Sequence, residues 1–103
     1  MVNKKHTIIA RAYDKRGKLI ARAINSYKQT HPLQAKYAQQ AGMPQRIYLH
    51  AEIACLLRAG VKPIHKLVIE RYHSNGEPAL AKPCPICQLA INDWSVKIVE
   101  YTQ

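Results

Sequence analysis

Short apolar segments separated by turn-forming residues predict four strands along this chain. Residues 6–13 and 18–25 are rich in apolar side chains, and the segment 14–17 between them ends in glycine. Two strands joined by such a short turn indicate a β-hairpin. Residues 66–72 have a mostly apolar middle, which is typical of a buried strand, and residues 96–101 predict a final strand.

Three further segments predict helices. One runs over residues 33–41, after a proline that suits the first turn of a helix, and stops at Gly42. The second spans residues 50–59 and stops at Gly60, and the third spans residues 83–93. Strands followed by helices along one chain predict an α/β domain with a mixed sheet of about four strands. A length of 103 residues predicts one domain over residues 1–103.

Composition narrows the class of protein. The net charge is +10, and residues 1–52 hold ten of the 16 Lys and Arg side chains against two acidic ones. Such a positive field attracts phosphate-bearing partners, although the same lysines can simply keep the surface solvated.

No apolar run approaches the ~20 residues that span a bilayer, so we expect no membrane partner. The basic start has no apolar segment of a signal peptide behind it, so we expect a cytoplasmic protein.

Two motifs carry the chemistry that the sequence predicts. His50-Ala51-Glu52 supplies an imidazole and a carboxylate, and the segment Pro83–Cys87 contains a Cys-x-x-Cys. One histidine and two cysteines are soft ligands for Zn²⁺, and three protein ligands leave the fourth position open for water, as in catalytic sites. Glu52 is then an extra carboxylate that can move protons. For one zinc ion to be held, the N-termini of the two helices must converge, and the strands before them must run parallel.

The same residues allow other interpretations. His31, His65 or His73 can serve as a fourth ligand and close a structural zinc site. The Cys-x-x-Cys alone is also compatible with redox chemistry, and the two motifs can coincide by chance. The structural interpretation leaves Glu52 without a purpose.

Together the two motifs form the pattern H-x-E…P-C-x-x-C, and on it the chain resembles the cytidine deaminase-like superfamily of zinc enzymes. The resemblance extends from the first hairpin to the last strand. It implies a three-layer fold of the cytidine deaminase type, with zinc between the N-termini of two helices. It also implies that His50, Cys84 and Cys87 bind zinc and that Glu52 is the proton shuttle.

Further residues are candidates for substrate binding. By the resemblance, the Ala51 N–H contacts the carbonyl oxygen of the base, the Lys82 carbonyl receives its amino group, and Asn25 lies against the sugar. Tyr27, in the basic loop after Asn25, can stack on a base or anchor the loop. His31 in the same loop can line the pocket or hydrogen-bond a phosphate, and it can equally cap the following helix or lie in solvent.

The expected function is hydrolytic deamination of cytosine in a nucleoside or nucleotide. An alternative is a cytosine deaminase that acts on single-stranded DNA or RNA, and a third is a non-catalytic, zinc-containing nucleic-acid-binding module. Superfamily members usually have a helix before the first strand and a further strand at the end, and the sequence predicts neither. One sheet face is therefore expected to lack cover, and from this we predict a homo-oligomer.

Overall fold

A computed structural model describes residues 6–103 of the chain. The basic start, from which we expect no signal peptide, lies outside the described residues. In chain order the elements are β1 (Thr7–Tyr13), β2 (Leu19–Ile24), α1 (Pro32–Gln40), α2 (Ala51–Ala59), β3 (Lys66–Tyr72), β4 (Pro78–Ala79), α3 (Pro85–Asp93) and β5 (Ile98–Tyr101). In this part of the chain, no helix is long and apolar enough to span a bilayer.

The predicted β-hairpin of β1 and β2 is confirmed. Asp14 organises its turn, because one carboxylate oxygen accepts hydrogen bonds from the backbone N–H groups of Arg16 and Lys18, both at 2.9 Å. Gly17 has a φ of 84°, which a residue with a Cβ rarely adopts. The turn residues therefore fix where the hairpin reverses.

The sheet has mixed pairing, as the sequence predicts. β1 pairs antiparallel with β2 on one side and with β3 on the other, and β5 pairs parallel with β3. Since β2 and β3 both oppose β1, they run parallel to each other, and their C-terminal ends lie near the start of β1. These are the strands that precede the two motif-bearing helices, so this part of the prediction is also confirmed. The expected number of about four strands omits β4, which pairs only two residues with β3.

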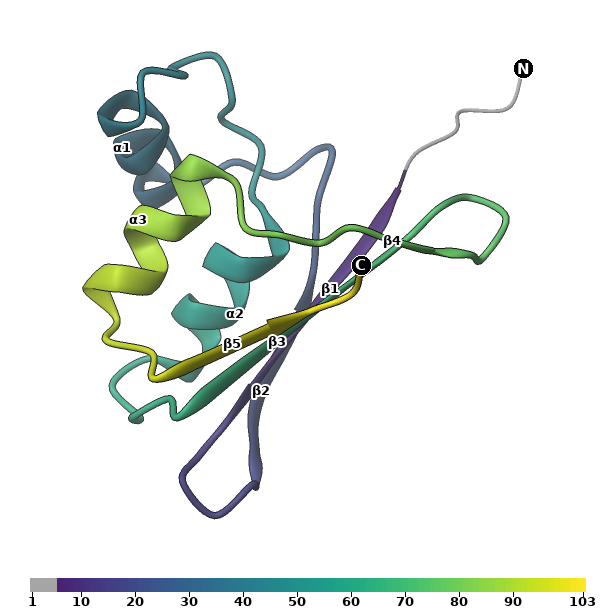
Figure 1. Ribbon diagram of the computed structural model, residues 1–103. Coiled ribbons are helices and arrows are strands. Elements are labelled where there is room, and N and C mark those ends of the chain that lie inside the picture. The colour runs from purple at the N-terminus through teal and green to yellow at the C-terminus, as the bar shows by residue number, and fades with distance from the viewer. Residues whose placement is uncertain (1–5) are drawn as a thin grey trace.

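All three helices lie on one face of the sheet (Figure 1). The burial pattern of the strands agrees, because Ala10 and Ala12 of β1 and Leu67 and Ile69 of β3 are fully buried while their neighbours along each strand are not. Residues 6–103 therefore form two layers, and the expectation of three layers is wrong for them. The chain has no described helix that covers the second face.

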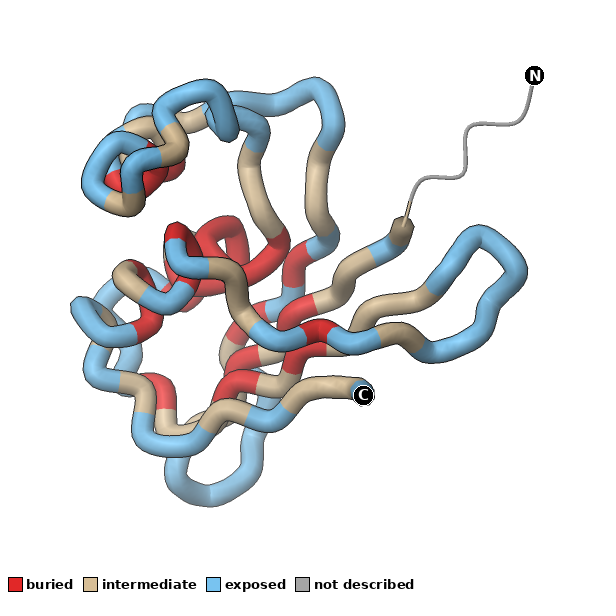
Figure 2. The backbone as a smooth tube through the Cα atoms, turned by 45° about the horizontal axis from the view of Figure 1, so that its top comes forward, coloured by how far each residue is buried: buried red, intermediate tan, exposed pale blue. Residues whose placement is uncertain are grey.

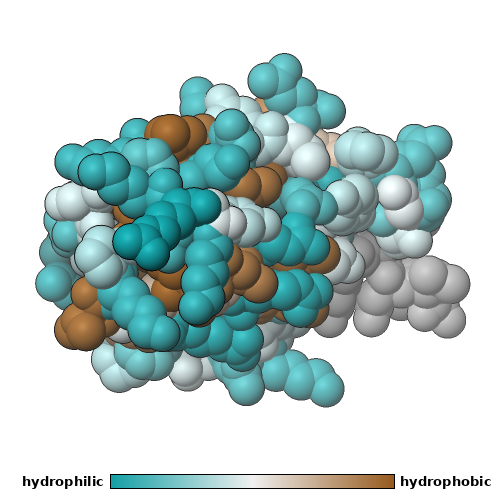
Figure 3. Space-filling view, turned by 90° about the horizontal axis from the view of Figure 1, so that it is seen from below, coloured by the Kyte–Doolittle hydropathy of each residue, from teal (hydrophilic) through white to brown (hydrophobic). Residues whose placement is uncertain are grey.

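Polar contacts occupy part of that second face. Arg11 of β1 forms an ion pair with Glu70 of β3, and Lys66 lies 3.7 Å from a carboxylate oxygen of Glu100. Apolar side chains such as Ile24 stay half exposed among them. The end of the molecule seen in Figure 3 shows the same mixture, with hydrophobic patches separated by hydrophilic side chains. The homo-oligomer stays a prediction that this face motivates.

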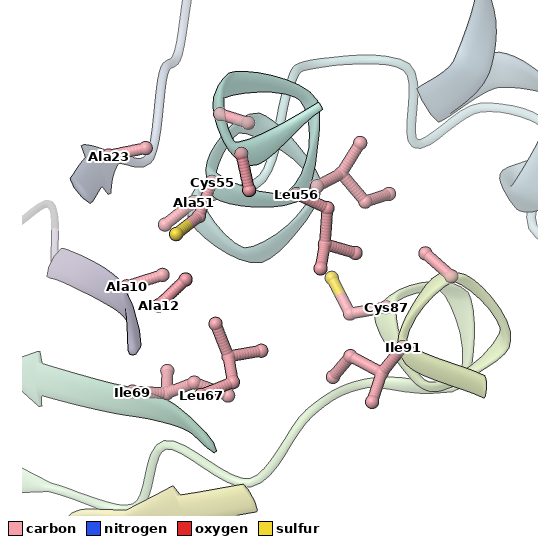
Figure 4. Packing of buried hydrophobic residues seen from close by; sticks show 14 of the residues in the cluster. Ala10, Ala12, Ala23, Ala51, Cys55, Leu56, Leu67, Ile69, Cys87 and Ile91 are labelled. Carbon is pink, nitrogen blue, oxygen red and sulfur yellow. The ribbon is translucent and has the colours of Figure 1, made fainter. Parts of the chain in front are cut away.

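The core lies between the helices and the sheet, where the buried positions gather (Figure 2). Small side chains line β1 and β2 beneath α2, so the helix packs closely on the strands. Figure 4 shows Cys55 of α2 directed toward these strands and Cys87 of α3 directed toward α2. The two cysteines therefore have different surroundings, and only Cys87 lies on the side where α2 meets α3.

Candidate metal centre

The loop before α2 is held against the end of β2 by backbone hydrogen bonds. The Ser26 N–H donates to the Leu49 carbonyl at 3.0 Å, and the Leu49 N–H donates to the Gln29 carbonyl at 2.9 Å. Thr30 and Tyr48 form an isolated antiparallel bridge beside them. These bonds bring His50 back to the end of β2, although α1 separates the two in sequence.

Two of the metal-ligand candidates occupy the same position on different helices. His50 is the N-cap residue of α2, and Cys84 is the N-cap residue of α3. Neither side chain makes a capping hydrogen bond to its own helix, so both are available for other contacts. Cys87 lies one turn further along α3 and is fully buried. The two helix N-termini thus converge as the sequence predicts, and the helices begin at Ala51 and Pro85, one and two residues after the expected starts.

The three donor atoms lie close together. His50 Nδ1 is 3.2 Å from Cys87 Sγ and 3.5 Å from Cys84 Sγ, and all three atoms lie within 4.8 Å of one another. In a tetrahedral zinc site with Zn–S bonds of about 2.3 Å and Zn–N bonds of about 2.0–2.1 Å, sulfur and nitrogen ligands are about 3.6 Å apart. The donor set and its spacing therefore fit a metal ion that takes sulfur and nitrogen ligands.

No second histidine joins this group as a fourth ligand in residues 6–103. His31 instead caps α1, because its Nδ1 accepts a hydrogen bond from the Leu33 N–H at 3.0 Å. The ring of His73 lies 4.9 Å from that of His6, between centroids. Of the roles expected for His31, the structure shows the helix cap. The described residues therefore group three possible metal ligands, one fewer than a closed tetrahedral site needs.

Glu52 lies beside the group on the first turn of α2. It is only 5% exposed, and its Oε1 atom has no hydrogen-bond partner. Burial raises the pKa of its carboxyl group, and the neighbouring His50 opposes this rise. A buried carboxylate without a full set of partners is costly for the fold, so its place beside three soft donors makes Glu52 a candidate functional residue.

The two thiols differ in their affinity for a proton. A hydrogen bond from Cys87 lowers the pKa of the Cys84 thiol to about 4, and the same contact together with burial raises the pKa of Cys87. A hydrogen bond with Cys84 is the main cause that raises the pKa of His50. Cys55 is different, since burial raises the pKa of its thiol to about 12. The sulfur of Cys84 is therefore ready to bind a cation, whereas Cys55 is an inert core residue.

Gln34 of α1 positions His50, and sequence reasoning missed it. Its side chain is fully buried and makes two hydrogen bonds of 3.2 Å. Its Nε2 donates to the Arg46 carbonyl, and its Oε1 accepts from the His50 N–H. A polar residue within an amphipathic helix is usually exposed, so only its burial identifies this role.

Asn25, Tyr27 and His50 all line a cavity of about 310 Å³. The Asn25 side chain accepts a hydrogen bond from the Ile8 N–H at 2.9 Å and donates to the His6 carbonyl at 3.3 Å. The Tyr27 hydroxyl donates to the same carbonyl at 2.9 Å. Both side chains therefore anchor the loop to the start of β1, and Tyr27 as a residue stays 44% exposed.

A second cavity, of about 180 Å³, is lined by His50, Glu52 and Cys84 of the two motifs. Ala51 lies in the core beside it and begins α2, so its N–H has no acceptor within the helix. Sequence reasoning missed Arg46 and Arg71 here. The period-two alternation along β3 could have found Arg71, which shares the face of Leu67 and Ile69. The lining residues are Ile8, Arg46, His50, Glu52, Arg71, Ala81, Lys82 and Cys84.

Comparison of the sequence with protein-family models and with curated proteins gives no match.

Proposed function

We propose that this chain belongs to the cytidine deaminase-like superfamily and removes the amino group of a cytosine base by zinc-dependent hydrolysis. The products are a uracil base and ammonia. One observation carries the proposal: three soft donors converge at two helix N-termini, and a buried carboxylate with an unpartnered oxygen lies beside them. A purely structural site gains nothing from that carboxylate.

Zn²⁺ is the ion that this donor set favours, with His50 Nδ1 and the two sulfurs of Cys84 and Cys87 as its ligands. When bound, zinc supplies the Lewis acidity that makes water a nucleophile near neutral pH. The protein contributes the open fourth position, because the group has three members. A cavity of about 180 Å³ lies beside it and is lined by His50, Glu52 and Cys84 among others.

Glu52 is the group that moves protons. Its carboxylate takes a proton from the attacking water and gives one to the ring nitrogen of cytosine. The water oxygen forms a bond to C4, and Glu52 then carries the second proton of that oxygen to the amino nitrogen. As the C4–N bond breaks, ammonia leaves and a carbonyl oxygen remains on C4. General acid–base catalysis of this kind contributes about 10²–10⁴-fold to a rate. The burial that raises the pKa of Glu52 suits a residue that must alternate between its two protonation states.

Four other residues have proposed contacts with the substrate. The Ala51 N–H, which has no acceptor within α2, is assigned to the carbonyl oxygen of the base. The Lys82 carbonyl is assigned to the amino group, since Lys82 lines the cavity of the motif residues. Asn25 is assigned to the sugar and Tyr27 to a stacking contact, because both line the adjoining cavity.

Ammonia release tests the proposal. Zinc-loaded protein is incubated with cytidine, deoxycytidine, their monophosphates, adenosine and a cytosine-containing single strand. We expect turnover of a cytosine nucleoside or nucleotide, and we expect Glu52→Gln to retain zinc and lose at least 100-fold in kcat. Glu77→Gln is the matched control, because Glu77 is an exposed glutamate in the loop before β4.

Each other outcome identifies a different function. Turnover of the single strand alone favours an enzyme that acts on a splayed base in a polymer. Release of ammonia from adenosine alone refutes the choice of cytosine. A wild-type protein that binds zinc and releases ammonia from none of these substrates refutes the enzyme and favours the non-catalytic nucleic-acid-binding module.

A further inference from the structure

Three basic side chains share the small cavity with the motif residues. Arg46, Arg71 and Lys82 line the same space of about 180 Å³ as His50 and Glu52. Glu52 is the only carboxylate in that lining, and it is buried. Three cations around one buried carboxylate leave an excess of positive charge at the place where a substrate enters. A cavity with this charge selects an anionic ligand.

Arg71 supplies the strongest sign of a missing partner. It lies near the C-terminal end of β3, and its Nε atom is buried without a hydrogen bond. The backbone N–H of the same residue donates to the Thr102 hydroxyl at 3.0 Å, so the unpartnered group is the side-chain Nε. A buried N–H group without an acceptor is rare in folded proteins and indicates that a ligand or water fills the position.

The carboxylates of the neighbouring elements are engaged elsewhere. In the described part of the chain, the ion pairs join Arg11 to Glu70 and Lys66 to Glu100, and neither involves a cation of the cavity. Arg46, Arg71 and Lys82 therefore have no acidic partner of their own within residues 6–103. Their positive charges can therefore pair with an anionic ligand.

Arg46 also links the two cavities. The larger one, of about 310 Å³, shares Ile8, Arg46 and His50 with the smaller one and reaches the exposed rings of Tyr27 and Tyr48. A ligand that spans the two cavities therefore lies against both Arg46 and His50. Guanidinium groups bind phosphate with paired N–H donors, which a neutral sugar cannot match.

We propose that Arg46, Arg71 and Lys82 form a phosphate subsite beside the metal centre, so that the substrate is a cytosine nucleotide with a phosphate monoester rather than a free nucleoside. This inference rests on the proposed function for the identity of the base. The phosphate requirement itself rests on the cations and on the unpartnered Arg71. A monoester carries more negative charge than a diester of a polymer, and it therefore suits three cations better.

Binding of the reaction product tests the subsite without turnover. Affinities of the zinc-loaded protein for uridine and for uridine monophosphate are measured by calorimetry at fixed salt. We expect the monophosphate to bind at least tenfold more tightly. We expect Arg71→Gln to lower this ratio about tenfold, which corresponds to the loss of one charge-assisted hydrogen bond. Arg16→Gln, in the exposed β1–β2 turn, is the charge-matched control and leaves the ratio unchanged.

A second variant guards against a folding defect in Arg71→Gln. Lys82 is exposed, so Lys82→Gln is expected to fold normally and to lower the ratio as well. Equal affinity for uridine and its monophosphate in the wild-type protein overturns the subsite. So does a ratio that neither variant changes, and so does tighter binding of a short uracil-containing single strand than of the monophosphate.

The two proposals fail in different ways. If cytidine and its monophosphate are deaminated with equal kcat/KM and the Arg71 variant changes nothing, the deaminase stands and the phosphate subsite is wrong. If no substrate releases ammonia but the monophosphate still binds in an Arg71-dependent manner, the subsite stands and the deaminase is wrong.

Discussion

Gln34→Leu removes the two hydrogen bonds that tie α1 to the segment leading to His50, while it keeps the volume of the side chain nearly constant. The substitution leaves the His50 N–H and the Arg46 carbonyl without their partner. An unsatisfied buried group costs about 1–3 kcal/mol, so two partly buried groups cost about 2–4 kcal/mol in the free energy of unfolding. Residues that orient a metal ligand also change metal affinity by about 10–100-fold.

Urea unfolding and a competitive zinc titration measure these two effects. With a slope of about 1.5 kcal/mol per molar urea, a loss of about 3 kcal/mol lowers the midpoint by about 2 M. Gln39→Leu is the matched control, because Gln39 is exposed on the same helix. If Gln34→Leu and the control have the same midpoint and the same zinc affinity, Gln34 does not position His50 and the reasoning is refuted.

Three further predictions follow from the structure. At a thousandfold excess over its Kd, zinc should stabilise the fold by about 4 kcal/mol and raise Tm by about 15 °C or more. We expect His50→Ala to abolish this rise in Tm and Cys55→Ala to retain it. An equal rise in both variants contradicts the assignment of His50 as a ligand. Burial and the 2.6 Å hydrogen bond to Asp93 raise the pKa of Tyr37 from 10.0 to about 12. Between pH 10 and 12 the unfolded chain loses this proton while the folded chain keeps it, so the free energy of unfolding falls in this range. In urea titrations, Tyr37→Phe should make this fall shallower. If the free energy of unfolding falls equally with pH in both proteins, the pKa shift is contradicted. Sedimentation at micromolar concentration should show a homo-oligomer, and a monomer contradicts that prediction.

Local pattern predicted the elements, because each long segment has its own period and its own stop signal. Gly42 and Gly60 follow the ends of α1 and α2, and both have a positive φ that favours glycine. β4 was missed because two paired residues are too short for any period, and one of them is proline. The layer number was missed for another reason: it came from the resemblance, and no periodicity within this chain determines which face each helix covers.

The residues of the candidate site could be predicted where they form an uncommon sequence pattern, but not where their residue type is common on protein surfaces. Histidine, two cysteines and a glutamate at such spacing have few other uses, so His50, Cys84 and Cys87 could be placed together before the fold was known. Glutamine and arginine occur on every protein surface. Gln34 therefore became visible only through burial, which depends on how α1 packs. Alternation along β3 places Arg71 on the inner face, but only the folded chain shows that its Nε atom lacks a partner.

The N-cap positions of α2 and α3 hold residues that suit metal coordination but do not cap their own helices, which lowers the intrinsic stability of those helices. His31 at the same position of α1 caps its own helix, whereas His50 and Cys84 face each other and leave two first turns uncapped. Serine, asparagine or aspartate there stabilises a helix by about 1 kcal/mol. A library selected for thermal stability in a chelator should therefore enrich those residues at positions 50 and 84, and selection with zinc present should restore histidine and cysteine.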